Sequence, residues 1–233
     1  MQFDNAAIAK VVRELRESKG LSQDVLSGLA GIARTHLTMI ENGSKHPNFE
    51  TVWKLAVALD MRPSELIALV EKEILEVKQA IYPRQYMDSV EKYAEEFGVD
   101  EYLLLAFIKT ESGFDAKAVS SADAIGLTQI TEETFSWIKS KLCPKEELVF
   151  EDLYNPETSI RFGAYYISRC LDRYAGDIST AAAAYHSGWG TVDKLLRENE
   201  SEILTEFPYP QMENYVYKIN KAYNAYQELY KIS

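Results

Sequence analysis

Residues 108–129 read IKTESGFDAKAVSSADAIGLTQ, and the helix pattern DEYLLLAFIKTES leads into them. Leu104, Phe107 and Ile108 recur at the spacing of one helix face. Glu111 falls three residues after Ile108, on the same apolar stripe. Burial disfavours the charged form of a carboxylic acid and raises its pKa, which is what a general acid needs near neutral pH. We therefore predict that Glu111 is a proton donor; the alternative is that it ends its helix and points to solvent.

Three later segments add to the Glu-Ser pair and the Gly-Leu-x-Gln turn of this stretch. They read LYNPETSIRFGAYYI at 153–167, AAYHSGWG at 183–190 and NYVYKI at 214–219. In this order the segments resemble the motifs of the lytic transglycosylases, relatives of goose-type lysozyme. The resemblance covers residues 85–233. It implies an α-helical, lysozyme-like domain whose partner is the glycan strand of peptidoglycan.

The resemblance implies a reaction with one catalytic residue, Glu111. Its acid would protonate the glycosidic oxygen between N-acetylmuramic acid and N-acetylglucosamine. The resulting carboxylate would then take the proton of the sugar's own 6-hydroxyl, which closes a 1,6-anhydro ring without metal or cofactor. Glycosidases usually need a second carboxylate, and Asp115 and Asp123 are the nearest candidates. We interpret both as solvated loop acids, so a single carboxylate is expected.

Further substrate-binding residues are implied position by position. The chain departs from the family pattern twice: a histidine replaces the usual asparagine of the Ala-Tyr-Asn-Ala-Gly loop, and Thr128 replaces the usual methionine of the Gly-Leu-Met-Gln turn. For each tyrosine the alternative is core packing with a satisfied hydroxyl. The predicted substrate-binding set is Ser120, Gln129, Tyr185, His186 and Tyr215.

The first seventy residues predict five short helices. Ser22 precedes QDVLSGLAG and suits an N-cap, Gly31 breaks the chain, and an Asn-Gly pair ends the helix after it. Helix, glycine-containing turn and helix form the helix-turn-helix arrangement. The segment LSQDVLSGLAGIARTHLTMIENGSKHPNFETVWKLAVAL resembles the lambda-repressor/Cro-like (XRE) family, and the resemblance covers about residues 5–70.

This second resemblance implies a surface for palindromic operator DNA. It places Arg34, Thr35, Thr38 and Met39 at base edges, and Gln23, Ser44 and Lys45 at phosphates. Residues 1–70 hold eight Lys/Arg and eight Asp/Glu, and such neutrality is unusual where a basic patch normally dominates DNA affinity. The alternative is that these side chains form an ordinary solvated face.

The two halves differ abruptly in composition. All 15 tyrosines lie at or after Tyr82, and the net charge of −11 belongs entirely to the part after residue 70. Residues 64–82 read SELIALVEKEILEVKQAIY, which predicts one uninterrupted helix at the join. We therefore expect an all-α chain: a five-helix repressor-like domain (1–70), a helical connector (71–84) and a lysozyme-like domain (85–233).

The join also bears on assembly and origin. The apolar side chains of the last helix exceed what so small a domain can bury alone, so we predict a homodimer through the first domain; they are Leu66, Ile67, Val70 and Ile74. A transcription-factor fold joined to a cell-wall enzyme has two possible origins. We prefer the interpretation that the chain is an engineered fusion in which the two domains share a helix; the alternative is a natural protein of a mobile element. Other readings of the whole are a regulator whose second half binds saccharide without cleaving it, and an assembly scaffold.

We predict the cellular compartment from two targeting signals, a signal peptide and a membrane-spanning segment. Residues 1–19 are charged throughout and no stretch approaches 18 apolar residues, so neither a signal peptide nor a membrane partner is predicted. The chain as written would be cytoplasmic, although the enzyme family acts at the cell wall. Cys143 and Cys170 are expected to be ordinary thiols.

Overall fold

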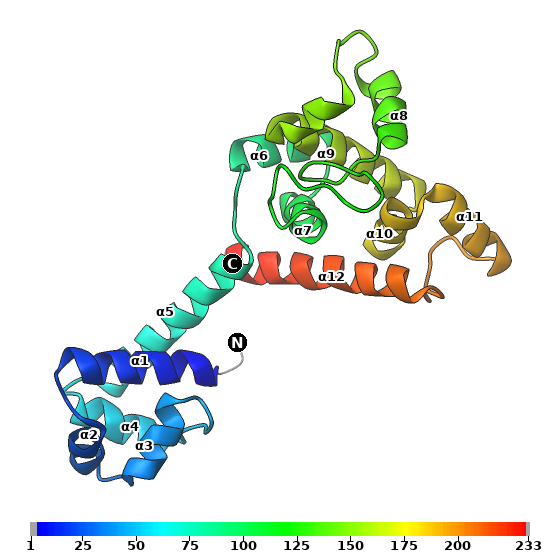
Figure 1. Cartoon of the computed structure of the whole chain (residues 1–233). Helices are drawn as coiled ribbons and strands as arrows, with labels where there is room; N and C mark the ends of the chain where they lie inside the picture. Colours follow the sequence, from blue (N-terminus) through cyan, green and yellow to red (C-terminus); the bar gives the residue numbers. More distant parts are fainter. Residues whose placement is uncertain (1–3, 232–233) are drawn as a thin grey trace. The chain divides into compact units, whose positions relative to one another are not determined.

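The computed structural model describes residues 4–231 and consists of helices and loops. Over this range there are twelve α-helices, one 3₁₀ helix and no strand, only isolated bridges from Ile125 to Val119 and to Ile130. The all-α prediction is confirmed. The chain divides into two compact units, Met1–Ile81 and Tyr82–Ser233, and both are drawn in Figure 1. The predicted connector 71–84 falls on the last part of the first unit and the first residues of the second.

The first unit contains the five predicted helices. Ser22 caps α2 by accepting from the Val25 amide, and Gly31 ends that helix in the left-handed conformation, as predicted. Asn48 caps α4 in the same way, through the Thr51 amide. The helices are α1 (Asn5–Ser18), α2 (Gln23–Ala30), α3 (Arg34–Glu41), α4 (Phe49–Ala58) and α5 (Pro63–Ile81).

Helix α5 runs unbroken to Ile81, which confirms the predicted continuous helix. Its apolar side chains do not support the reason given for dimerisation. Leu66, Val70 and Ile74 are buried in the unit's own core, where α1 packs against α5, and only Ile67 is exposed, at 36%. That argument is wrong because the small domain does bury this face. Dimerisation itself stays a prediction.

The second unit is arranged around α7. Side chains from Leu103 to Ile108 are all buried, and the helix packs against α6, α9 and α12; in Figure 1, α7 is seen nearly end-on. The helices are α6 (Met87–Phe97), α7 (Glu101–Glu111), α8 (Glu132–Leu142), η1 (Phe150–Tyr154), α9 (Pro156–Arg173), α10 (Ile178–Ser187), α11 (Trp189–Glu198) and α12 (Pro210–Tyr230).

The loop between α7 and α8 is pinned at both ends. Ser112 donates its hydroxyl to the Leu127 carbonyl, at 2.9 Å, and so ties the helix end to the far side of the loop. Gly126 has φ +78°, and a Cβ there would lie 2.2 Å from the Leu153 carbonyl oxygen. Only glycine fits this position, because the loop backbone lies directly on η1.

Two smaller expectations concern thiols and membranes. Cys143 and Cys170 are free and buried, as expected. Within residues 4–231, no helix combines the length and the apolar character that crossing a membrane requires.

Candidate active site and nucleic-acid interface

Glu111 is the last residue of α7 and lines a cavity of about 370 Å³. Over residues 4–231, its side-chain hydrogen-bond partner is the Tyr215 hydroxyl from α12, which donates to Oε1. Burial raises the pKa of Glu111 to about 7, and the hydrogen bond from Tyr215 opposes that rise. A carboxyl whose pKa lies near neutral pH can give a proton and take one back.

Aromatic rings pack around the tyrosine that donates to this carboxyl. Phe107, one turn earlier on α7, contacts the rings of Tyr185 and Tyr215 at centroid distances of 4.9 and 6.5 Å. The Tyr185 hydroxyl donates to the Thr128 carbonyl at 2.6 Å. The His186 ring stacks on Tyr215, at 4.5 Å and 13°. These contacts shield Glu111 from water, and they fix the ring of Tyr215, which donates the hydrogen bond to Glu111.

Two predicted residues of the loop between α7 and α8 line the cavity and also hold that loop together. The Ser120 hydroxyl accepts from the amides of Ala122 and Ala124. Gln129 adopts a left-handed backbone conformation, φ +49°, and its amide donates to the carbonyls of Ala118 and Gly126. Each side chain thus fixes the loop and faces the cavity.

The structure brings most of the predicted set together. Ser120, Gln129, Tyr185 and His186 line the cavity with Glu111, while Tyr215 reaches the site through its hydrogen bond to Glu111. Their roles toward a substrate stay predictions. Sequence reasoning missed the other lining residues, although Tyr166 stands inside the quoted segment 153–167. They are Ser121, Ala122, Ala124, Ile130, Thr131, Thr134 and Tyr166.

Thr128 has a structural explanation. It is fully buried, and its hydroxyl donates to the Ser159 carbonyl at 2.9 Å. A Cβ on Gly163 would lie 2.3 Å from the Thr128 methyl carbon, so the side chain fills the space that this glycine leaves on α9. The threonine that replaces the usual methionine therefore packs against α9, and it is not among the side chains that line the cavity.

The two other candidate acids do not reach the cavity. Asp115 and Asp123 are both exposed, as predicted for loop acids, and Asp115 accepts from the Lys117 amide. Of the described residues that line the cavity, Glu111 is the only Asp or Glu. The described lining of this cavity thus offers one carboxyl, whereas glycosidases usually use two.

In the first unit, the predicted base-contacting residues lie on α3. Arg34, Thr35 and Met39 are exposed, and Thr38 is half-buried. The predicted phosphate contacts Ser44 and Lys45 are also exposed, the Ser44 hydroxyl donating to Asn42 at 2.6 Å. Arg34 forms an exposed ion pair with Asp24 at 3.3 Å, a contact of little energy that leaves the guanidinium available.

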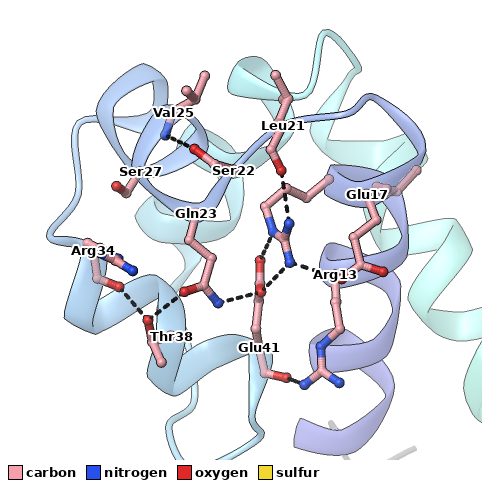
Figure 2. A network of polar contacts seen from close by, with 12 residues as sticks. Arg13, Glu17, Leu21, Ser22, Gln23, Val25, Ser27, Arg34, Thr38 and Glu41 are labelled. Atoms are coloured by element: carbon pink, nitrogen blue, oxygen red, sulfur yellow. Dashed lines mark hydrogen bonds and ion pairs between the residues drawn. The ribbon is translucent and has the colours of Figure 1, made fainter.

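Gln23 is held inside a polar network, drawn in Figure 2. Its amide nitrogen donates to Glu41 at 2.8 Å, and its oxygen accepts from the Thr38 hydroxyl at 3.1 Å. Glu41, 2% exposed, also accepts two hydrogen bonds from Arg16. The phosphate contact predicted for Gln23 would have to compete with these bonds.

An α-helical unit with one half-buried carboxyl in the lining of a cavity, together with a helix-turn-helix unit, defines the class of this protein. The model of the transglycosylase SLT domain family matches residues 88–208, and a helix-turn-helix model matches residues 12–66. The chain belongs to the transglycosylase SLT domain family, and it joins that domain to a helix-turn-helix domain, as the two resemblances implied.

Curated relatives share part of this chain. The membrane-bound lytic murein transglycosylase C of Yersinia pestis (strain Pestoides F) is 29% identical over 167 residues, which cover 61% of this chain and 47% of the relative. The protein of that name from Yersinia pseudotuberculosis serotype O:1b (strain IP 31758) gives the same values. The chain thus spans about half the length of the curated relatives it matches.

Solved structures agree on the fold. The 70-kDa soluble lytic transglycosylase of Escherichia coli superposes with a TM-score of 0.62 at 19% identity, covering 83% of this chain and 33% of that one. An inactive variant of the lytic transglycosylase Slt from Pseudomonas aeruginosa gives 0.58 at 18% identity, over 94% and 37%. A complex of the 70-kDa enzyme with bulgecin A gives 0.60 at 19% identity, over 83% and 33%. At these identities the likeness concerns the fold alone.

Proposed function

We propose that the second unit is a peptidoglycan lytic transglycosylase that cleaves the β-1,4 bond between N-acetylmuramic acid and N-acetylglucosamine. The observation that carries the proposal is the single carboxyl of the cavity, Glu111, with a pKa of about 7. A group half protonated at neutral pH serves as acid in one step and as base in the next. The family and the relatives named lytic murein transglycosylase supply the substrate class.

The proposed reaction has two proton transfers through Glu111. Its carboxylic acid protonates the glycosidic oxygen as the bond to the muramic C1 breaks, and N-acetylglucosamine leaves as the alcohol. The 2-acetamido group of the muramic residue stabilises the positive charge at C1. The carboxylate then removes the 6-hydroxyl proton while O6 bonds to C1. The products are a 1,6-anhydromuramic end and a free 4-hydroxyl, and Glu111 is again protonated.

The surrounding residues have supporting roles in this proposal. Tyr215 fixes the direction of the Glu111 carboxyl through its hydrogen bond. Ser120 and Gln129 present the loop wall to the sugar, and Tyr185 and His186 close the other side. His186 has a depressed pKa because of burial, so its ring is neutral at pH 7 and can accept or donate a hydrogen bond without adding charge.

The test of the enzyme is the clearing of a peptidoglycan suspension. The parent chain is expected to lower the turbidity, and a heat-inactivated sample gives the baseline. A folded parent chain that leaves turbidity unchanged would contradict a catalytic role. It would favour the alternative of a saccharide-binding or scaffold domain.

For the first unit we propose binding of palindromic operator DNA as a homodimer, since repressor-like units read two half-sites as symmetric dimers. Support comes from the exposed side chains of Arg34, Thr35 and Met39 on α3. A gel shift with repressor-type operators tests it, with Arg34→Ala expected to weaken specific binding by about 1–3 kcal/mol if Arg34 pairs with a base. We also propose that the two domains were joined by engineering through a shared helix. Support comes from α5, which runs unbroken where the composition changes.

A further inference from the structure

A second cavity, of about 340 Å³, adjoins the one that holds Glu111. The two cavities share Thr134 on α8 and Tyr166 on α9 as lining residues. The second is completed by Glu133, Trp137, Gly188 and Trp189. A ligand that lies over Glu111 therefore continues past Tyr166 into a space with an aromatic wall. No role has been given to this space so far.

Three aromatic rings from three helices form that wall, and each is half-buried. Trp137 of α8 meets Trp189 of α11 edge to face, with centroids 5.1 Å apart and planes at 83°. Tyr166 stacks on Trp189 at 5.8 Å and 20°, and contacts Trp137 at 6.0 Å and 70°. The rings pack directly on one another, so ligands meet only their outward faces and edges.

The wall is held in place before any ligand binds. The indole nitrogen of Trp189 donates to Cys170 Sγ at 3.2 Å, and the Arg173 guanidinium lies 5.2 Å from the Trp189 ring centroid. Arg173 is itself paired with Asp193. A surface whose rotamers are already fixed loses little entropy on binding, so these contacts favour a binding function.

The aromatic surface also continues toward the catalytic carboxyl. Tyr166 contacts the Tyr185 ring at 5.0 Å, and Tyr185 lines the Glu111 cavity. The rings of Trp137, Trp189, Tyr166 and Tyr185 thus follow one path along the two cavities. A polymer of rings joined end to end matches such a path better than a compact ligand does.

We propose that Trp137 and Trp189 form a stacking subsite for a pyranose ring of the glycan strand, beside the residues held over Glu111. The inference rests on the proposed function, whose substrate it extends. The C–H face of a pyranose is apolar while its hydroxyls point outward, so it suits an aromatic face with a wet rim. The same cavity has one carboxylate in its lining, Glu133, so binding of a stem-peptide ammonium is the alternative that the experiment has to separate.

The subsite predicts a dependence on strand length. A saccharide too short to reach Trp137 loses the stacking contact, while a longer one gains it. Binding energy from a remote part of the substrate can be used to orient the reacting centre. Longer strands should therefore bind more tightly.

Tryptophan fluorescence tests the proposal directly, because the chain has only three tryptophans. The third, Trp53, lies in the first unit and is 51% exposed, so Trp53→Phe leaves the two pocket tryptophans as reporters. Glu111→Gln in the same chain prevents turnover. The probes are peptide-free N-acetylglucosamine oligosaccharides of increasing length. Longer oligosaccharides are expected to shift and quench the emission, and a disaccharide is expected to leave it unchanged.

Substitution of Trp137 then isolates the stacking contact. In the Glu111→Gln background, Trp137→Leu should raise the Kd for the long oligosaccharide about two- to tenfold and leave that for the disaccharide unchanged. Trp137→Phe, which keeps a ring, should fall between. The matched control is Tyr217→Leu, because Tyr217 is 61% exposed on α12 and two residues from Tyr215, on another face of that helix; its Kd should equal the parent value.

Several outcomes would overturn the subsite. The first two are a Kd that is unchanged in Trp137→Leu and a tryptophan emission that does not change when oligosaccharide binds. The others are no binding of oligosaccharide at all, or binding only when the ligand carries a stem-peptide ammonium. Failure of the proposed function would look different. The parent chain would then release no anhydro products from peptidoglycan, while length-dependent binding to the Glu111→Gln chain persisted.

Discussion

Two glutamates end helices in this molecule and lie away from solvent, and their partners differ. Glu41, at the end of α3, accepts hydrogen bonds from Arg16 and from Gln23. Glu111, at the end of α7, accepts a hydrogen bond from the Tyr215 hydroxyl, and burial raises its pKa to about 7. Burial alone therefore does not mark a catalytic acid. A buried carboxylate with a cation stabilises the fold, and one without a cation keeps a proton that it can give away.

The largest expected effect separates the two glutamates by activity. Glu111→Gln should lower peptidoglycan clearing by more than about 10³-fold, because it removes both the acid and the base while keeping size and hydrogen bonding. Glu41→Gln should leave the rate within about twofold, since it alters only the first unit. Initial clearing rates measure both, with circular dichroism as the check on folding. A Glu111→Gln rate near the parent value would refute the assignment.

The raised pKa of Glu111 should also appear in the pH dependence of stability of the second unit. The folded pKa of Glu111 lies above its ordinary value of 4.5, so the folded state binds the extra proton and loses stability as pH rises from about 4.5 to about 7. Glu111→Gln removes that loss. Its second unit should be more stable than the parent's at pH 8, by about 1–3 kcal/mol. Denaturant curves at pH 5 and pH 8 check the sign, and equal differences at both would contradict the raised pKa.

Removing the cation beside Glu41 should destabilise the first unit only. Arg16→Met leaves a carboxylate that is 2% exposed without its guanidinium, and breaking a buried pair in this way costs about 3–5 kcal/mol. Amide hydrogen exchange should accelerate in α1 and α3 and stay unchanged in α7. Exchange that remains slow in α3 would mean that Gln23 alone satisfies Glu41.

A smaller effect should come from Tyr215, the hydrogen-bond donor to Glu111. Tyr215→Phe removes the hydrogen bond that lowers the pKa of Glu111, so that pKa should rise further, by about one pH unit. The protonated acid then persists to higher pH, and the alkaline limb of the kcat/KM profile moves up with it. Tyr217→Phe serves as the control. A profile that moves to lower pH would show that Tyr215 does not stabilise the carboxylate.

The smallest effect concerns the helix at the end of the first unit. Two glycines inserted after Val77 lie beyond Ile74, the last residue of α5 in the core, so both units should keep their stability within about 2 kcal/mol. An insertion after Glu73 would disturb both Ile74 and the Lys10–Glu73 ion pair. Small-angle scattering should change if α5 sets the orientation of the units. An unchanged profile would end the idea of a rigid join.

Local features were predictable, because they depend on neighbours in the sequence. The Ser22 cap, the Gly31 stop and the apolar stripe that carries Glu111 all follow from spacing along one helix or turn. Contacts between distant segments were not. Gln23 turns inward because Glu41 is 18 residues away, and Leu66 is buried because α1 covers α5.

The cavity also combines residues that the sequence predicts with contacts that it does not predict. Resemblance to a family supplied Ser120, Gln129 and Tyr185, whose positions follow motif spacing. The wall of Trp137 and Trp189 comes from helices that meet only in the folded unit, and neither residue stands out in its own segment. One amino-acid sequence by itself does not show that Trp137 and Trp189 are in contact.

The central claim is that Glu111 acts as both acid and base, with the sugar's own 6-hydroxyl as the nucleophile. Mass spectrometry of the soluble products from purified peptidoglycan tests it most directly, because anhydro ends are lighter by one water than hydrolysed ends. The account predicts 1,6-anhydromuropeptides from the parent chain and none from Glu111→Gln. A digest dominated by reducing muramic ends would contradict it, since a water molecule would then have attacked C1 in a cavity whose lining shows one carboxyl.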